Sequence, residues 1–490
     1  MKKRCVLFIL ALFLGCGGLI AAHGVLSAQA DDVVLTEHTL YGDRAAADGI
    51  TMTQKTQMNY RLFWDTTCTL GGTPDVSTKF HFSPAQQYDF SDDYTVELEN
   101  VIGYSVYGDI DSRDSLDDAL YCYWDVIEAV ASRAPNDSTK YREVVSLNEY
   151  LDCIPIHVNL HLKRDVDIYW DNLRELDQRL TEAFHIPFPE DCVAEIQLRK
   201  NADGTISELD FNVIHDPNLF LSSAVTEDAC YIIPYGEGVL NGDFPMGYGV
   251  FRFPYQIDSS SEALTVNADQ LSLFFPVPKD TINLDQLGTS ALKLMLSSDQ
   301  QKMFIPWFDT FSDTSDTLGG NFANYLSVLN LKTGQEEQIL QLPFQDNRTL
   351  WKSYIGEDFM VLIDTSANAV VLENIDGVWK NVLEFSISEE IIKELNVSGN
   401  DWTSPILVDD CVMAWNGRQL AILSGNQYND QTVPSDCTLY LSVFGTNGLE
   451  YCGRYDSSLD ARDQIPYGDS DYMPCSPVNV NPLSVAWSDS

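Results

Sequence analysis

The C-terminal half of the chain repeats one local plan three times, and this repeat limits the possible folds. Each repeat has four short apolar runs separated by turns rich in Gly, Asp and Asn, and successive repeats start roughly 50–60 residues apart. Short strands joined by such turns predict antiparallel sheets of four strands. In chain order the predicted strands are Leu292–Leu296, Met303–Phe308, Tyr325–Leu331 and Gln338–Leu342, then Trp351–Ile355, Phe359–Asp364, Val370–Glu373 and Val378–Phe385, then Cys411–Trp415, Gln419–Ser424, Thr438–Phe444 and Leu449–Arg454.

Two turns in the last repeat predict strand register. Asn416-Gly417 is a strong hairpin dipeptide, and Thr446-Asn447 predicts a two-residue loop. That loop would place Leu441 opposite Cys452. Cys437 would then lie four residues from Leu441, about 13 Å along the strand from the position opposite Cys452. That distance is too long for a disulfide between Cys437 and Cys452.

Two further turns resemble those of known families. Ser298-Asp299-x-x-Lys302 and Asn330-Leu331-Lys332-Thr333-Gly334 resemble the hairpins of WD40 and TolB-like proteins, although the Trp-Asp and Gly-His markers of WD40 blades are missing. This resemblance covers about residues 220–490 and implies an all-β β-propeller, for which we expect six to eight four-stranded blades. We expect the tail Val478–Trp487 to close the ring as a strand against the first blade. The whole chain also resembles a group of exported bacterial proteins, which implies no mechanism.

The N-terminal half is less regular. It contains a predicted helix near residues 166–184 and a predicted hairpin of Val193–Arg199 with Ile206–Ile214. Two architectures are open: further blades with one helical insertion, which we favour, or an N-terminal α+β module before a propeller-like domain. The predicted organisation is a leader over 1–30, a β-rich region over 31–219 and blades over 220–490. The other strands predicted in this half are Asn59–Cys68, Tyr94–Val101, Leu120–Ile127 and Ile154–Lys163.

The first thirty residues have the pattern of an export signal. A basic start at Lys2, Lys3 and Arg4 precedes an apolar run, and small residues lead to Ala30. Cleavage after Ala30 therefore predicts a secreted protein. Two alternatives are an uncleaved membrane anchor and a lipoprotein with Cys16 as its lipidated residue. In every case the protein works outside the cytoplasm, and only the N-terminal segment contacts the membrane.

Composition excludes some classes of partner. The chain has 73 acidic residues against 29 Lys and Arg, a net charge of −44, so we expect no nucleic acid as partner. Of the 11 cysteines, Cys5 and Cys16 lie in the leader, and the odd number left predicts at least one unpaired thiol. None of them forms C-x-x-C, which argues against a zinc knuckle.

The candidate metal site is an acidic loop. Asp109, Asp111 and Asp114 begin like an EF-hand loop, but Asp114 stands where Gly is needed and Leu120 where the bidentate Glu belongs. A looser calcium site on Asp109, Asp111 and Asp114, or with Asp117 in place of Asp114, is the one metal hypothesis, and no other cofactor is expected. His157 and His161 alternate with apolar residues, which predicts a solvent-exposed strand face.

No residue pattern predicts catalysis. Ser290-x-x-Lys293 and Lys332-Thr333-Gly334 match elements of penicillin-binding proteins, but they fall in a predicted strand and a predicted turn, so we interpret the match as coincidence. The sequence therefore favours a non-catalytic binding or interaction module for an unknown extracellular or envelope ligand. The alternatives are a secreted propeller hydrolase acting on carbohydrate with two carboxylates, and a membrane-tethered accessory protein of a transporter or sensor.

Overall fold

A computed structural model describes most of the chain, and the statements below concern these residues. They are 17–18, 20–21, 24–25, 33–58, 62–71, 74–82, 94–98, 103–116, 118–162, 170–171, 173–215, 219–258, 263–277, 293–310, 322–344, 350–364, 368–386, 411–425, 438–458 and 479–488. The leader residues Cys16 and Ala30 lie outside them. No helix within them is both long enough and apolar enough to span a membrane.

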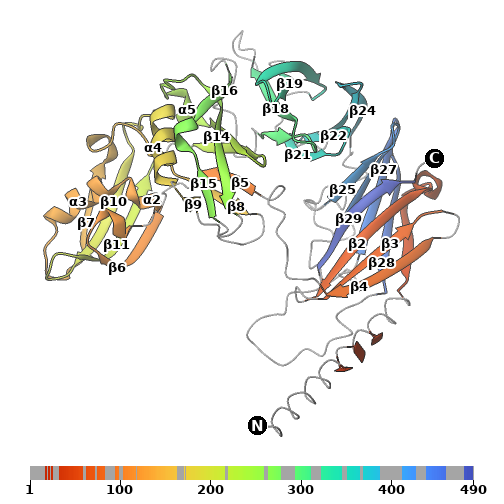
Figure 1. Cartoon of the computed structure of the whole chain (residues 1–490), viewed down its shortest axis with the longest axis horizontal. Coiled ribbons are helices and arrows are strands. Elements are labelled where there is room, and N and C mark those ends of the chain that lie inside the picture. The colour runs from red at the N-terminus through yellow and green to blue at the C-terminus, as the bar shows by residue number, and fades with distance from the viewer. Residues whose placement is uncertain are drawn as a thin grey trace, which may run out of the picture. The chain divides into compact units, whose positions relative to one another are not determined.

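The described chain is mostly β, as predicted, and its sheets are largely antiparallel sets of four strands (Figure 1). Such sheets are the units from which β-propellers are built. The chain separates into two compact units, one of residues 1–87 with 352–490 and one of residues 88–351. The boundary expected between 219 and 220 falls between two strands of the second unit, where the chain passes from one sheet to another.

The first unit contains three sheets. Their orders are β21-β22-β23-β24, then β1-β28-β27-β26-β25, and β29-β2-β3-β4. The strands are β1 (Leu35–Gly42), β2 (Ile50–Met58), β3 (Leu62–Thr69), β4 (Asp75–Phe82), β21 (Leu350–Ile355), β22 (Phe359–Asp364), β23 (Asn368–Ile375), β24 (Val378–Ser386), β25 (Cys411–Trp415), β26 (Leu420–Gly425), β27 (Thr438–Gly445), β28 (Gly448–Ser457) and β29 (Asn479–Trp487), with a 3-10 turn η1 (Arg44–Ala47).

Strands from both ends of the sequence complete these sheets. β29 lies beside β2 and pairs with it antiparallel (Figure 1). Trp487 stands opposite Ile50 in this pair, and β1 pairs with β28, where Leu35 stands opposite Ser457. The predicted tail strand is therefore confirmed, and it joins an N-terminal strand. The predicted number of six to eight blades stays a prediction.

A bulge shifts the register of the β27–β28 hairpin. Gly445 pairs with Gly448, so Thr446-Asn447 is the predicted two-residue loop. The ladder then slips by one residue between Val443 and Phe444, and Ser442, not Leu441, lies opposite Cys452. The predicted pairing is wrong because an extra residue on one strand offsets every later pair.

A polar network lies among the buried side chains of the first unit. The Arg44 guanidinium is 2.7 Å from Glu37, and the Tyr451 hydroxyl donates to the same carboxylate at 2.9 Å. The Tyr455 hydroxyl is 2.8 Å from that of Tyr451. Burial raises the pKa of both tyrosines, so both hydroxyls stay protonated hydrogen-bond donors.

Several cysteines are free thiols, which confirms the prediction of at least one unpaired thiol. They include Cys68, Cys153, Cys230 and Cys452, whereas Cys437 lies outside the described residues. Burial raises the pKa of Cys68 and of Cys452 to about 11, so these two thiols are protonated at neutral pH.

The second unit combines blade-like sheets with a helical module. The sheet orders are β17-β18-β19-β20, β6-β11-β10-β7, β5-β8, and β12-β13-β14-β15-β9 with β16 also paired to β14. The strands are β5 (Tyr94–Leu98), β6 (Gly103–Ile110), β7 (Tyr141–Ser146), β8 (Val158–Leu162), β9 (Trp170–Asp171), β10 (Val193–Lys200), β11 (Ile206–Ile214), β12 (Phe220–Val225), β13 (Ala229–Tyr235), β14 (Gly249–Asp258), β15 (Ala263–Val266), β16 (Ser272–Pro276), β17 (Met295–Leu296), β18 (Lys302–Thr310), β19 (Phe322–Asn330) and β20 (Gln335–Leu342). The helices are α2 (Asp118–Tyr121), α3 (Trp124–Arg133), α4 (Leu173–Phe184) and α5 (Glu237–Leu240), with 3-10 turns η2 (Arg113–Ser115), η3 (Leu147–Glu149) and η4 (Ala268–Gln270).

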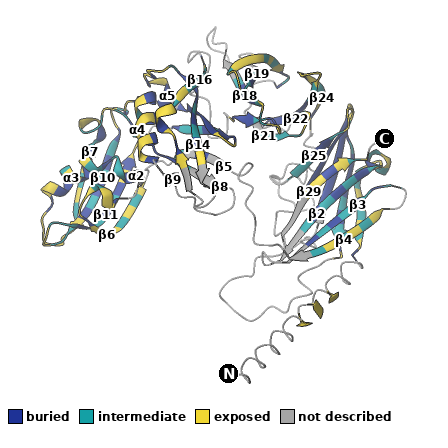
Figure 2. Ribbon diagram, in the orientation of Figure 1, coloured by how far each residue is buried: buried dark blue, intermediate teal, exposed yellow. Residues whose placement is uncertain are grey.

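Two predictions in this module are wrong. The apolar run Leu120–Ile127 lies in α2 and α3, not in a strand, and α3 buries Val126, Ile127 and Val130 at helical spacing. A short apolar run does not distinguish a buried strand from a helix. The predicted helix over 166–184 begins only at Leu173, because Trp170–Asp171 forms β9 against β15. α4 buries one face and exposes the other (Figure 2).

Candidate functional site

The second unit contains a polar cleft of about 1030 Å³, at the upper end of the range for small-molecule sites. One wall comes from the β12–β13 turn, β13, β14 and β16, and the other from the β17–β18 and β19–β20 turns. The lining residues are Thr226, Glu227, Asp228, Tyr231, Arg252, Ser272, Leu273, Phe274, Ser298, Asp299, Gln300, Gln301, Leu331, Lys332, Thr333 and Gly334.

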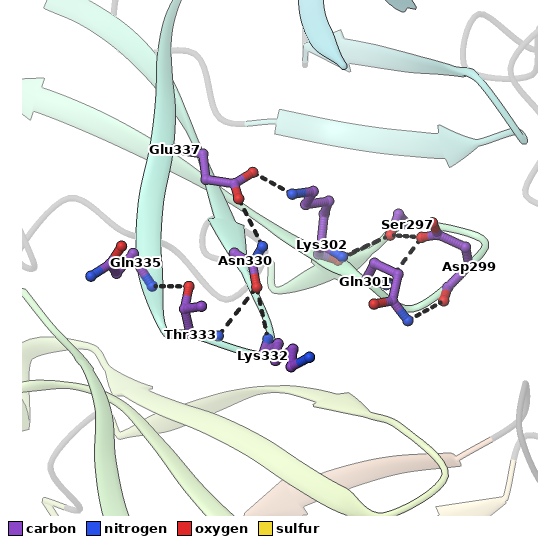
Figure 3. A network of polar contacts seen from close by, with 9 residues as sticks. All are labelled: Ser297, Asp299, Gln301, Lys302, Asn330, Lys332, Thr333, Gln335 and Glu337. Carbon is purple, nitrogen blue, oxygen red and sulfur yellow. Dashed lines mark hydrogen bonds and ion pairs between the residues drawn. The ribbon is translucent and has the colours of Figure 1, made fainter. Parts of the chain in front are cut away.

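The β17–β18 turn is fixed by its own hydrogen bonds. Oδ1 of Asp299 accepts from the Ser297 hydroxyl at 2.6 Å and from the Gln301 backbone N–H at 3.0 Å (Figure 3). The Lys302 backbone N–H donates to the Ser297 hydroxyl oxygen at 2.9 Å. The Ser297 hydrogen bond is the main cause that lowers the pKa of Asp299, so this carboxyl is ionised at neutral pH.

The β19–β20 turn is fixed in the same way. Oδ1 of Asn330 accepts from the backbone N–H groups of Lys332 at 3.0 Å and Thr333 at 3.2 Å (Figure 3). The Asn330 amide donates to Glu337 at 2.7 Å, and the Lys302 ammonium pairs with the same carboxylate. The Lys302 contact is the main cause that lowers the pKa of Glu337. Glu337 on β20 therefore joins the end of the β17–β18 turn, at Lys302, to the start of the β19–β20 turn, at Asn330.

An ion pair shapes the opposite wall. Nη2 of Arg252 is 3.2 Å from Oδ2 of Asp228, and Nε of Arg252 donates to the Tyr231 hydroxyl at 3.3 Å. The Arg252 guanidinium also lies 5.9 Å from the centre of the Tyr231 ring. Burial raises the pKa of Tyr231, so its hydroxyl stays protonated. These contacts hold the Arg252 side chain at the cleft.

The two walls touch at Gly334. Its φ is +66°, and a Cβ there would lie 3.0 Å from the backbone oxygen of Phe274. Glycine satisfies both the left-handed backbone and the close approach. The Phe274 ring in turn packs edge-on against Tyr231, with ring centres 5.0 Å apart. The cleft is therefore formed before any ligand arrives.

Sequence reasoning identified both turns as hairpin turns but not as parts of one site. The pairing of β18 with β19 and of β19 with β20 confirms the turns. The opposite wall, with Asp228 and Arg252, has no recognisable sequence motif. Its residues come to the same cleft as the two turns only through the tertiary fold. The Lys332-Thr333-Gly334 triplet, interpreted as coincidence with a penicillin-binding element, lies in a hairpin turn as expected.

The predicted calcium residues have separate partners. Asp111 accepts from the Ser115 hydroxyl at 2.7 Å, Asp114 pairs with Arg174 at 3.2 Å, and Asp109 accepts from the Asn201 amide at 3.4 Å. Within the described ranges, no three His, Cys, Asp or Glu side chains are placed to hold a metal ion. The described structure gives the calcium hypothesis no support.

His157 is buried, so its predicted place on a solvent-exposed face is wrong. Its Nδ1 lies 2.6 Å from Oδ2 of Asp177 on α4, and only 6% of the His157 side chain is exposed. The missed signal is Asp177 itself, which stands between Leu173 and Leu180 on the apolar face of the predicted helix. The His161 side chain lies outside the described part.

Comparisons with known proteins give no family. No family model matches the sequence, and no curated protein is significantly similar to it. Similar solved structures include an oligogalacturonate lyase in complex with manganese (9% identity, 52% of this chain and 59% of that chain, TM-score 0.20). They also include the acylaminoacyl peptidase of Pyrococcus horikoshii (7%, 54% and 38%, TM-score 0.19) and the β-propeller domain of Myceliophteria thermophila Cps50 (10%, 53% and 81%, TM-score 0.22).

The chain spans only 59% and 38% of the length of the first two of these proteins. With TM-scores this low, the fold described above rests on the chain's own sheets.

Proposed function

We propose that the chain is a binding module and that the cleft holds a hydrophilic ligand without transforming it. The observation that carries this proposal is the preformed polar lining, in which the turn residues are already fixed by hydrogen bonds within the protein. A site that needs little ordering on binding loses less free energy to conformational entropy.

The lowered pKa of Asp299 in the cleft favours binding over glycoside hydrolysis. A hydrolase of that kind needs one carboxyl that keeps its proton near neutral pH, which requires a raised pKa. The pKa of Asp299 is instead lowered, and Asp228 is paired with Arg252. Asp299 is therefore better suited to accept hydrogen bonds from a ligand than to protonate a leaving group.

Ser272→Trp tests the proposal, because Ser272 is exposed at the cleft, opposite Arg252 on the neighbouring strand. The indole ring would occupy the space of a ligand. We expect saturation-transfer NMR against a panel of soluble saccharides, amino acids and short peptides to detect a ligand of the wild type that S272W does not bind. Ser132→Trp, on the exposed face of α3, is the matched control and should bind as wild type.

Two results would contradict this proposal. One is binding that S272W and S132W retain equally, which would place the ligand elsewhere. The other is chemical conversion of the bound compound by the wild-type protein, which would make the chain an enzyme.

We further propose that the module acts outside the cytoplasm. The leader pattern up to Ala30 and the net charge of −44 support this. Mass spectrometry of the mature N-terminus from the native host tests it. A chain that starts at Asp31, or a lipid-modified Cys16, agrees with export, whereas an intact chain recovered in the cytosol does not.

A further inference from the structure

We infer that the ligand of the cleft is a neutral, hydroxyl-rich oligosaccharide. This inference rests on the proposed binding function and names the class of ligand. It follows from how charge and hydrogen-bonding groups are distributed over the two walls.

Each wall of the cleft presents both signs of charge. One wall carries Glu227 and Asp228 with Arg252, and the other carries Asp299 with Lys332. An anionic ligand would meet a carboxylate on either wall, and a cationic ligand would meet a guanidinium or an ammonium. A neutral ligand avoids both repulsions, although the chain as a whole carries a charge of −44.

The groups left open in the cleft include both donors and acceptors. Among the described residues, no hydrogen-bond partner is found for Oδ2 of Asp299, the ammonium of Lys332 or the side-chain amide of Gln300. The Ser272 side chain is exposed. A carboxylate only accepts, an ammonium only donates, and an amide or hydroxyl does both. A sugar hydroxyl also does both, so neighbouring hydroxyls of one sugar can satisfy this mixed set.

The apolar part of the lining is small and half-buried. It consists of Leu273, Phe274 and Leu331. The C–H faces of a pyranose ring can pack on such a surface while its hydroxyls reach the polar turns. The volume of about 1030 Å³ exceeds what one sugar needs, so an oligosaccharide suits it better than a monosaccharide.

Titration calorimetry of the whole chain tests the inference with probes of equal length and different charge. The neutral probes are hexasaccharides of β-1,4-glucan, α-1,4-glucan, mannan and xylan. The charged probes are hexagalacturonate, a chitosan hexamer, and an acidic and a basic hexapeptide. We expect a neutral hexasaccharide to bind with an affinity that stays constant between low and high salt, because it carries no charge to be screened.

Substitutions place that binding in the cleft. We expect Asp299→Asn to lower the affinity for the neutral probe roughly tenfold or more, because a hydrogen bond to a charged carboxylate is stronger than one to a neutral amide. Asp203→Asn is the matched control. Asp203 caps the β10–β11 turn by accepting from Thr205, and its pKa is lowered as well, but it lies outside the cleft. Circular dichroism shows whether each variant is folded.

The outcomes separate the two levels of the argument. Binding of a charged probe that S272W abolishes, with no neutral probe bound, would overturn the oligosaccharide inference and leave the binding function standing. Absence of any binding that depends on Ser272 would overturn both. A neutral probe that binds D299N and wild type equally would also overturn the inference.

Discussion

At the scale of single residues, Gln54 on β2 has an environment at odds with its chemistry. Its side chain is fully buried, and neither atom of its amide has a hydrogen-bond partner among the described residues. It continues the inward-facing row of Ile50 and Met52, which pack in the apolar core of the first unit. An unpaired buried amide costs the free energy of its lost hydration.

Gln54→Met should therefore stabilise the protein. Met has nearly the same shape and no polar atoms to satisfy, so we expect the free energy of unfolding to rise by about 1–2 kcal/mol. Urea denaturation measures this change. Gln270→Met, at an exposed position, is the control and should have almost no effect. A lower stability of Q54M would show that the amide is satisfied after all.

The cleft residue Asp299 should give stability a defined dependence on pH. Its folded-state pKa is lowered, chiefly by the Ser297 hydrogen bond, whereas an unfolded Asp titrates near about 3.9. Its contribution is therefore present above that unfolded pKa and is lost as the pH falls through the folded pKa. We expect the stability difference between wild type and Asp299→Asn to be constant from pH 7 to about 5 and to shrink toward pH 3. Urea denaturation across this range measures it, and an equal difference at pH 3 and pH 7 would contradict the assignment.

At the scale of elements, α4 is joined to the segment before β8 by buried polar contacts. Oδ2 of Asp177 is 2.6 Å from Nδ1 of His157, and its Oδ1 accepts from the Val158 N–H at 3.1 Å. The Thr181 hydroxyl accepts from the Ile156 N–H at 2.8 Å. One face of the helix thus accepts hydrogen bonds from the backbone N–H groups of Ile156 and Val158, where β8 begins.

Removing Asp177 should be costly. Asp177→Ala leaves His157 buried without this carboxylate, and we expect a loss of about 3–5 kcal/mol in the free energy of unfolding. Asp269→Ala is a matched control, because Asp269 pairs with Arg179 of the same helix at 2.6 Å but on the exposed side. Loss of this exposed ion pair should lower the free energy of unfolding by about 1 kcal/mol or less. Equal effects in thermal or urea unfolding would contradict the role given to the buried pair.

The elements also show what the sequence could predict. Strands β18 to β28 follow from local patterns, because antiparallel neighbours are joined by short turns with recognisable residues. The run Leu120–Ile127 does not give a reliable prediction, because its length and apolar character suit a strand and a helix equally. The cleft could not be predicted from the sequence, for a different reason. Its two turns were recognised, but their approach to Arg252 depends on contacts between distant parts of the chain.

At the scale of the whole molecule, the first unit depends on strands from both ends of the sequence. β29 covers one edge of β2, and Val485 of β29 is buried in the same core as Ile50 and Met52. Without β29, β2 would become an exposed edge, which invites pairing with other chains.

Truncation before β29 should therefore destabilise the first unit. We expect removal of residues 479–490 to lower its free energy of unfolding by at least about 2 kcal/mol from the lost burial of Val485 alone. Differential scanning calorimetry measures the change, and light scattering should detect association of the truncated chains. Removal of only residues 489–490 is the control. Unchanged unfolding of the longer truncation would show that β29 adds nothing to the sheet.

The insertion of one unit within the other also sets an order of assembly. Glu37 and Tyr451 hydrogen-bond across 414 positions of sequence, and Val34 bonds Ser458 across 424. A chain that emerges N-terminus first can complete the inserted unit while β1 still lacks β28 and β2 still lacks β29. β2, β3 and β4 can pair with one another early, but β1 must wait for β28 and the outer edge of β2 must wait for β29. Closing so long a loop is slow. The unit that begins first is therefore the last whose sheets are completed.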